Sequence, residues 1–189
     1  MANLLLFDSE ARQALGAGVD KLAQAVGCTL GPAGQNVVIE MESGFPHVTK
    51  DGVTVAKSIT SADRYENLGM QIIKQASTST AENAGDGTTS STVLAHSFFH
   101  AGRKLIAAGY DKTKCLQGMS RCIDDALDTL DEFKKEVKSN EELRQISTIS
   151  ANGDAEIGRL ISDAFKQVGT SGAIHVTSAK GFKHYLNIT

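Results

Sequence analysis

The chain lacks the features that mark several common classes of protein. Its 189 residues contain no apolar run of the roughly 18 residues that a membrane-spanning helix needs. The amino-terminal stretch has neither the basic flank nor the long apolar segment of a signal peptide. The three cysteines are an odd number and have no Cys-x-x-Cys spacing, which favours free thiols over disulfides or metal ligands. We therefore expect a soluble, unexported protein that does not act at a membrane.

Other absences limit the chemistry. The formal net charge is only -3, so the chain lacks the excess of basic residues typical of a nucleic-acid-binding protein. It contains no G-x-x-x-x-G-K-[ST] motif, no G-x-G-x-x-G after a strand and no G-x-S-x-G. These absences exclude a P-loop and give no support to a triad hydrolase. A content of 41% hydrophobic and 22% charged residues is ordinary for a globular protein with a packed core.

Apolar periodicity predicts a mainly α fold with a small β-hairpin. The hairpin strands are expected at Asn36–Glu40 and Pro46–Thr49. Short strands are also predicted at Asn3–Phe7 and Ala173–Thr177, and Asp8 or Ser9 is expected to cap the first helix. Helices are predicted at Asp8–Gly27, at Asp63–Ala84, from the Asp-Gly-Thr-Thr turn to Gly109, along Leu116–Val137, at Glu141–Ile146 and at Ile157–Val168.

The segment Gly85–Thr92 (GDGTTSST) is the most informative part of the chain. It joins an acidic glycine turn to the first turn of an amphipathic helix. A helix N-terminus carries unpaired N–H groups and partial positive charge, so it can bind phosphate. Asp86 could hold Mg²⁺, which typically takes one or two protein carboxylates and completes its coordination with phosphate and water. Taken alone, the motif is more typical of an ordinary helix cap that binds no ligand.

Two further glycine turns could take part. Thr29–Gly34 (TLGPAG) follows the first helix, and its glycines permit a close approach of backbone to phosphate. Lys50–Gly52 follows the hairpin and could equally be a plain turn. A single site requires the three turns to converge in space, which the sequence does not establish.

A histidine pair on the third long helix has the spacing of a zinc half-site. His96 and His100 are four residues apart, but the glutamate of H-E-x-x-H is missing and no third ligand is evident. This favours ordinary surface or partly packed histidines.

Five segments resemble, in order and spacing, the group I chaperonins (the GroEL family). They are TLGPAGQNVVIE, VTKDGVTVAKSI, YENLGMQIIKQAS, AGDGTTSSTVLA and ISTISANGD. The resemblance runs from about Leu4 to Ile174. Ser90 stands where a third threonine is usual, and Ala33 and Gln35 replace a usual lysine and arginine.

The resemblance implies an ATP-dependent protein-folding subunit that acts in a heptameric ring, often stacked in pairs. In this family an equatorial domain binds ATP, an intermediate domain acts as a hinge, and an apical domain grips unfolded protein and a co-chaperonin lid. By this resemblance residues 1–133 are the first part of an equatorial-type domain. Residues 134–189 are the ascending part of a small α/β intermediate domain, and the apical domain is absent from this chain.

The resemblance also implies roles for individual residues. Asp86 matches the Mg²⁺ ligand, and Asp51 matches an acidic residue close to the terminal phosphate. The family's main catalytic carboxylate has no counterpart in these 189 residues, so we expect the chain alone to bind nucleotide weakly and to hydrolyse it negligibly. The matching positions are Thr29, Leu30, Gly31 and Pro32 for the nucleotide loop, Gly87, Thr88, Thr89 and Ser90 for the phosphates, and Lys50 with Thr29 and Thr89 for K⁺.

Two other interpretations stay open. One is a chaperonin-derived structural or assembly module that does not hydrolyse ATP, against which the preserved Gly-Asp-Gly-Thr-Thr argues. The other is a helical nucleotide-binding module of a different assembly, against which only the resemblance argues. The expected location is the cytoplasm of a bacterium or of a virus-infected host, or an organelle matrix.

Overall fold

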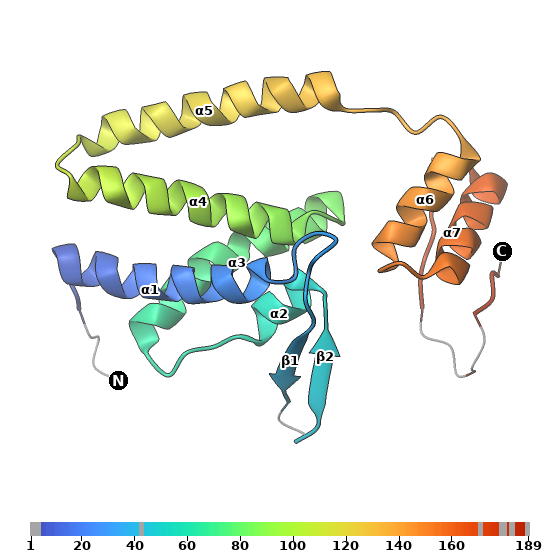
Figure 1. Ribbon diagram of the computed structural model, residues 1–189, viewed down its shortest axis with the longest axis horizontal. Coiled ribbons are helices and arrows are strands. Elements are labelled where there is room, and N and C mark those ends of the chain that lie inside the picture. Colours follow the sequence, from blue (N-terminus) through green and yellow to red (C-terminus); the bar gives the residue numbers. More distant parts are fainter. Residues whose placement is uncertain (1–4, 42–43, 170–171, 178–180, 182–183, 188–189) are drawn as a thin grey trace. The chain divides into compact units, whose positions relative to one another are not determined.

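The computed structural model describes residues 5–41, 44–169, 172–177, 181 and 184–187. The chain divides into two compact units, Met1–Ala126 and Leu127–Thr189, which are described separately. The described residues form seven helices and one two-stranded sheet, which confirms the mainly α fold with a hairpin (Figure 1). None of the helices in this part of the chain has the length and apolar character needed to cross a membrane.

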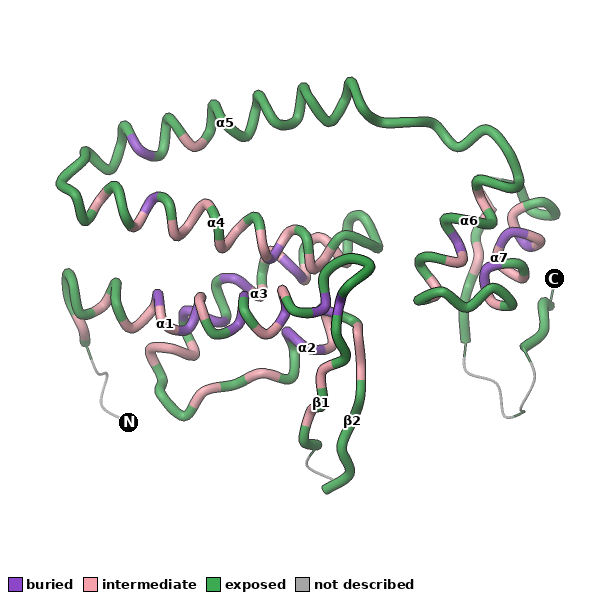
Figure 2. The backbone as a smooth tube through the Cα atoms, viewed as in Figure 1, coloured by how far each residue is buried: buried purple, intermediate pink, exposed green. Residues whose placement is uncertain are grey.

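Three long helices and one short helix build the core of the first unit. The long helices α1 and α4 run side by side, and α3 packs against both (Figure 1). The buried residues gather where these helices meet the short helix α2 (Figure 2). The helices are α1 (Asp8–Gly27), α2 (Gly52–Ser58), α3 (Arg64–Ala84) and α4 (Thr88–Ala107). The buried apolar side chains are Val19, Leu22, Ala23, Val26, Val55, Ala56, Met70 and Ile73.

Two glycines allow α1 and α3 to approach closely. A Cβ atom at Gly18 would overlap the backbone carbonyl of Glu66, and one at Gly69 would overlap that of Leu15. Each helix therefore presents a glycine to the backbone of the other. The core side chains on both helices interlock at this short separation.

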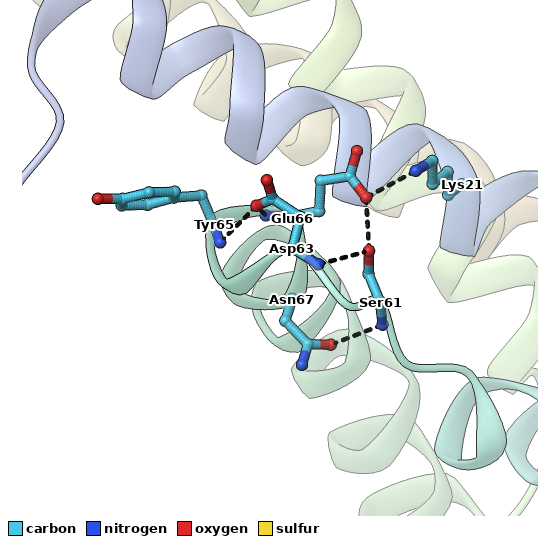
Figure 3. Close-up of polar contacts among 6 residues, drawn as sticks. All are labelled: Lys21, Ser61, Asp63, Tyr65, Glu66 and Asn67. Carbon is cyan, nitrogen blue, oxygen red and sulfur yellow. Dashed lines mark hydrogen bonds and ion pairs between the residues drawn. The ribbon is translucent and has the colours of Figure 1, made fainter. Parts of the chain in front are cut away.

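Polar contacts at the start of α3 add to this packing (Figure 3). The Asp63 carboxylate caps the helix by accepting hydrogen bonds from the N–H groups of Tyr65 and Glu66. The Glu66 carboxylate accepts from Lys21 Nζ on α1 and from Ser61 Oγ, each at 2.6 Å. These contacts tie the preceding loop and α1 to the first turn of α3.

The predicted hairpin is present. Strands β1 (Val37–Glu40) and β2 (Pro46–Thr49) pair antiparallel, with Val37 opposite Thr49 and Glu40 opposite Pro46. The strand end at Thr49 leads through Lys50 and Asp51 directly into α2. Lys50–Gly52 could be a plain turn on sequence grounds, but Gly52 begins α2, a seven-residue helix with three buried residues that the sequence pattern does not predict.

Helix α5 (Lys112–Phe133) ends the first unit and begins the second. It stops at Phe133, so the prediction that the helix extends to Val137 is wrong. Cys115 is its one buried residue, while Leu116, Leu127, Leu130 and Phe133 are exposed. The division between compact units falls inside α5, and the functional boundary at residue 133 stays a prediction.

The second unit is a pair of packed helices, α6 (Asn140–Ser150) and α7 (Ala155–Val168). Ser139 and Glu142 form a capping box at the start of α6. The turn between the helices contains two residues with positive φ, Asn152 and Gly153, and Asp154 caps α7. The helix expected at Glu141–Ile146 is thus longer and takes in the following Ser-Thr-Ile-Ser.

Three further local expectations are wrong. Ala173–Thr177 is not a strand, because no strand pairs with it among the residues that the structure describes. Residues 5–7 of the expected amino-terminal strand are also irregular, and Asn3 and Leu4 lie outside the described residues. The cap position of α1 is Phe7, and no side chain of Asp8 or Ser9 bonds to the helix end.

Candidate functional site

The loop after α1 positions the first group of candidate residues. Thr29 is buried, and its Oγ1 donates a hydrogen bond of 2.8 Å to the carbonyl of Val26. The loop closes when the N–H of Gly34 donates to the carbonyl of Gly31. Gly31 has a φ of +74°, a conformation that favours glycine. Leu30 and Pro32, which lie between Thr29 and Gly34, are exposed.

The end of the hairpin positions the second group. The Asp51 carboxylate caps α2 by accepting from the N–H groups of Val53 and Thr54 and from the Thr54 hydroxyl. Partial burial acts to raise the pKa of Asp51, but these hydrogen bonds and the charge of Lys57 outweigh it. The pKa of Asp51 therefore lies below its ordinary value, and the carboxylate is charged at neutral pH.

The connection between α3 and α4 positions the third group. Gly85 ends α3 and Gly87 precedes α4, with φ of 76° and 82°, both in the left-handed region. Asp86 lies exposed between them, and its carboxylate accepts a 2.6 Å hydrogen bond from the N–H of Gly87. Whereas aspartates cap α2 and α3, no side chain of the described residues caps α4.

The first turn of α4 is therefore open to a ligand. Its N–H groups belong to Thr88, Thr89 and Ser90, which also carry hydroxyls. The Ser91 N–H is the first to bond back, to the carbonyl of Gly87. An open helix N-terminus with adjacent hydroxyl donors suits an anion, and the exposed Asp86 carboxylate suits a divalent cation bound to that anion.

The structure brings parts of all three groups together. The Oγ1 atoms of Thr29 and Thr89 are 3.5 Å apart, across 60 residues of sequence. Gly52 is buried, and a Cβ atom there would overlap Thr89 Oγ1. The loop after α1, the start of α2 and the start of α4 thus meet at Thr89, while Lys50 lies half-buried at the end of β2.

Gly52 is a residue of this junction that the sequence analysis noted only as part of a turn. A glycine directly after the Asp51 cap, at the start of a short apolar helix, is a weak signal by itself. Its contact with Thr89 depends on how α2 and α4 pack, so only the tertiary structure shows why a side chain is excluded there.

Comparison with known proteins gives the family. The model of the TCP-1/cpn60 chaperonin family matches residues 22–183, which is most of the chain. The chain belongs to this family. The match spans the loop after α1, the hairpin end and the start of α4, so the three candidate groups all lie within it.

A curated relative supports the same family assignment. The chain is 49% identical over 176 residues to the mitochondrial chaperonin CPN60 of Euglena gracilis, covering 93% of this chain and 31% of that protein. The resemblance to group I chaperonins is thereby confirmed. The chain spans about a third of the length of this chaperonin relative.

Solved structures of chaperonins share the fold. One is the chaperonin gp146 of bacteriophage EL 2 (Pseudomonas aeruginosa), in the presence of ATP-BeFx, with a TM-score of 0.76 and 28% identity over 90% of this chain and 30% of that one. Another is a group III chaperonin in the open state, with a TM-score of 0.69 and 26% identity over 85% of this chain and 32% of that one.

Proposed function

We propose that this chain supplies the phosphate-binding part of an Mg-ATP site in a protein-folding chaperonin subunit. The observation that carries the proposal is the uncapped start of α4, which lies beside Thr29 and Gly52. Family membership makes a chaperone the natural setting for such a site. A related chaperonin, gp146, has been crystallised with ATP-BeFx, and this supports nucleotide as the ligand.

The residues present fit Mg-ATP. The first-turn N–H groups and hydroxyls of α4 donate, and phosphate oxygens accept. Asp86 is exposed beside them and can take a position in an octahedral magnesium shell. Gly52 keeps the space next to Thr89 free of a side chain, and Gly31 and Gly87 provide the turns that bring backbone to the phosphates.

Mg-ATP would supply a phosphoryl group whose charge the metal partly neutralises. The chain's own residues would bind and orient it. The helix start of α4 holds phosphate, Asp86 holds the metal, and Leu30 and Pro32 border the nucleotide. The charged Asp51, already fixed by its hydrogen bonds to α2, would lie near the terminal phosphate.

A potassium ion is part of the proposal. Thr29 and Thr89 present two hydroxyl oxygens 3.5 Å apart, and Lys50 directly precedes Asp51, which caps α2. Hydroxyl and backbone carbonyl oxygens are suitable ligands for a weakly hydrated monovalent cation. Such an ion would join the loop after α1 to the start of α4.

Hydrolysis and folding belong to the larger assembly in this proposal. An intact subunit would couple ATP hydrolysis to movement of a hinge domain within a heptameric ring, on unfolded substrates and with a co-chaperonin lid. No residue of this chain matches the main catalytic carboxylate of the family. We expect the 189-residue chain alone to bind Mg-ATP weakly and to release phosphate at a negligible rate.

The test is calorimetric binding of ATP, with and without Mg²⁺, to the wild-type chain and to Asp86→Asn. Because Asp86→Asn removes a charged contact to the metal, its affinity for ATP in the presence of Mg²⁺ should be about tenfold or more below that of wild type. Without Mg²⁺ the two proteins should bind alike. The matched control is Asp111→Asn, which removes an exposed carboxylate at the start of α5 instead. Equal Mg-ATP affinity of wild type and Asp86→Asn would refute the metal role, and no ATP binding at all would refute the site.

A further inference from the structure

We propose that Asp20, His96 and His100 form a binding site for a divalent transition-metal ion such as Zn²⁺, separate from the candidate nucleotide site. One potential ligand atom from each residue, a carboxylate oxygen or a ring nitrogen, lies within 4.8 Å of the other two. Asp20 comes from α1 and both histidines from α4, so the site joins two helices of the first unit. Asp20 supplies the third ligand that is not evident from the sequence, because it lies 76 residues before His96.

The histidines are arranged as a chelating pair. They lie one turn apart on the same face of α4, and their rings stack with centroids 5.8 Å apart and planes at 26°. His96 Nε2 is 2.9 Å from Asp20 Oδ1, a separation at which one ion can touch both atoms. Two imidazoles and one carboxylate, with further positions open to water, are a donor set that suits zinc and its neighbours rather than magnesium.

A second observation points to a ligand. Nδ1 of His100 is buried and has no hydrogen-bond partner among the residues that the structure describes. Burying a ring nitrogen without a hydrogen-bond partner costs free energy of folding, and coordination of a metal ion or a hydrogen bond would offset that cost. Among the described residues, His96 Nε2 is paired with Asp20 Oδ1, whereas His100 Nδ1 has no partner.

Surrounding contacts hold the carboxylate in place. Arg103 donates to Asp20 Oδ2 at 3.3 Å, which leaves Oδ1 facing His96. The guanidinium is itself fixed, because it lies 5.7 Å from the centre of the Phe99 ring and packs against Gly16, where a Cβ atom would overlap it. Hydrogen bonds to a ligating carboxylate orient it for the metal. The positive charge of Arg103 also repels a cation, so we expect weaker binding than at a site of three histidines.

The metal site is accessible to solvent, and it lies on the same helix, α4, as the candidate nucleotide site. The Asp20 and His96 side chains are 31% and 28% exposed, so an ion can enter from solvent and keep water ligands. His96 follows the first turn of α4 by about two helical turns. An ion there would link α1 to α4.

Zinc binding to the chelator-treated chain, measured by calorimetry, tests the proposal. Cys28→Ser/Cys122→Ser serves as the parent protein, because both thiols are exposed and would bind zinc on their own account. The parent should bind one Zn²⁺ equivalent. His96→Gln and His100→Gln should each weaken binding at least tenfold, in line with the sensitivity of metal sites to loss of a contact. His47→Gln, which removes an exposed histidine of β2, should not weaken it.

Two further readouts separate a metal site from a structural cluster. Zn²⁺ should raise the thermal midpoint of the parent and of His47→Gln, but not of His96→Gln or His100→Gln. Co²⁺ should give visible d–d bands in the parent that are lost in both variants. Circular dichroism without metal shows whether each variant is folded. A folded parent that binds no zinc, or zinc binding that is unchanged in both His96→Gln and His100→Gln, would overturn the proposal.

Discussion

Replacing Gly69 by alanine is expected to force α1 and α3 apart. The new Cβ atom would overlap the backbone carbonyl of Leu15, which cannot rotate away as a side chain could. The helices must then shift, and the side chains of Leu22, Met70 and Ile73 lose part of their contact. Gly118 on α5 is the matched control, because a Cβ atom there meets nothing within 4 Å of the described structure.

The two substitutions are expected to change the free energy of unfolding in opposite directions. Alanine in a helix interior is favoured over glycine by about 0.5–1 kcal/mol, and Gly118→Ala should show this gain in full. Overpacking a well-packed core costs about 1–3 kcal/mol, with the upper end appropriate to a backbone obstacle. Gly69→Ala should therefore be less stable than wild type by about 2 kcal/mol after the helix gain is subtracted.

Urea unfolding followed by circular dichroism measures both variants. The midpoint should fall for Gly69→Ala and rise for Gly118→Ala, with similar slopes, because the surface exposed on unfolding is nearly unchanged. In thermal melts the shifts should be about 2–4 °C for each kcal/mol. A Gly69→Ala variant as stable as Gly118→Ala would refute the close approach of α1 and α3.

Two further predictions concern charge and capping. Hydrogen bonds from Lys21 and Ser61 hold the pKa of Glu66 below its ordinary value of 4.5. The contact therefore stabilises the fold fully above pH 4.5, and this stabilisation is lost as the pH falls from there through the lowered pKa. The stability advantage of wild type over Glu66→Gln, measured by urea unfolding at several pH values, should shrink in acid, and a difference independent of pH would contradict this. Ser139→Ala should reduce the stability of α6 by about 1 kcal/mol, because it breaks the capping box with Glu142. Hydrogen exchange of the α6 amides should become faster, while exchange in α1 stays unchanged; no change in α6 would contradict the cap.

The regular helices could be predicted because their signals are local. Apolar periodicity predicts α1, α3, α4 and α7, and Gly27 at the end of α1 and Gly85 after α3 predict where these two helices stop. The hairpin followed from two short apolar segments around a turn. The errors lie where local signals are weak. Helix α2 has only seven residues, and Ala173–Thr177 has strand-like residues but no strand beside it in the described part of the chain.

The residue types of the candidate site were determined by sequence alone. An acidic glycine turn before hydroxyl-rich residues predicts a helix start near Thr88, and α4 does begin there. That no side chain of the described residues caps this start is a finding of the structure, since the motif by itself also fits an ordinary cap. The ordered motifs were sufficient to indicate the chaperonin family, since each carries its own residues and spacing.

What only the tertiary structure decided is which distant residues meet. Thr29, Gly52 and Thr89 come from three separate segments, and their contact depends on how α1, α2 and α4 pack around a shared core. The same packing brings Asp20 of α1 to His96 and His100 of α4. Local patterns follow from backbone geometry over a few residues, whereas these encounters follow from burial of apolar surface by the whole unit, which no single segment encodes.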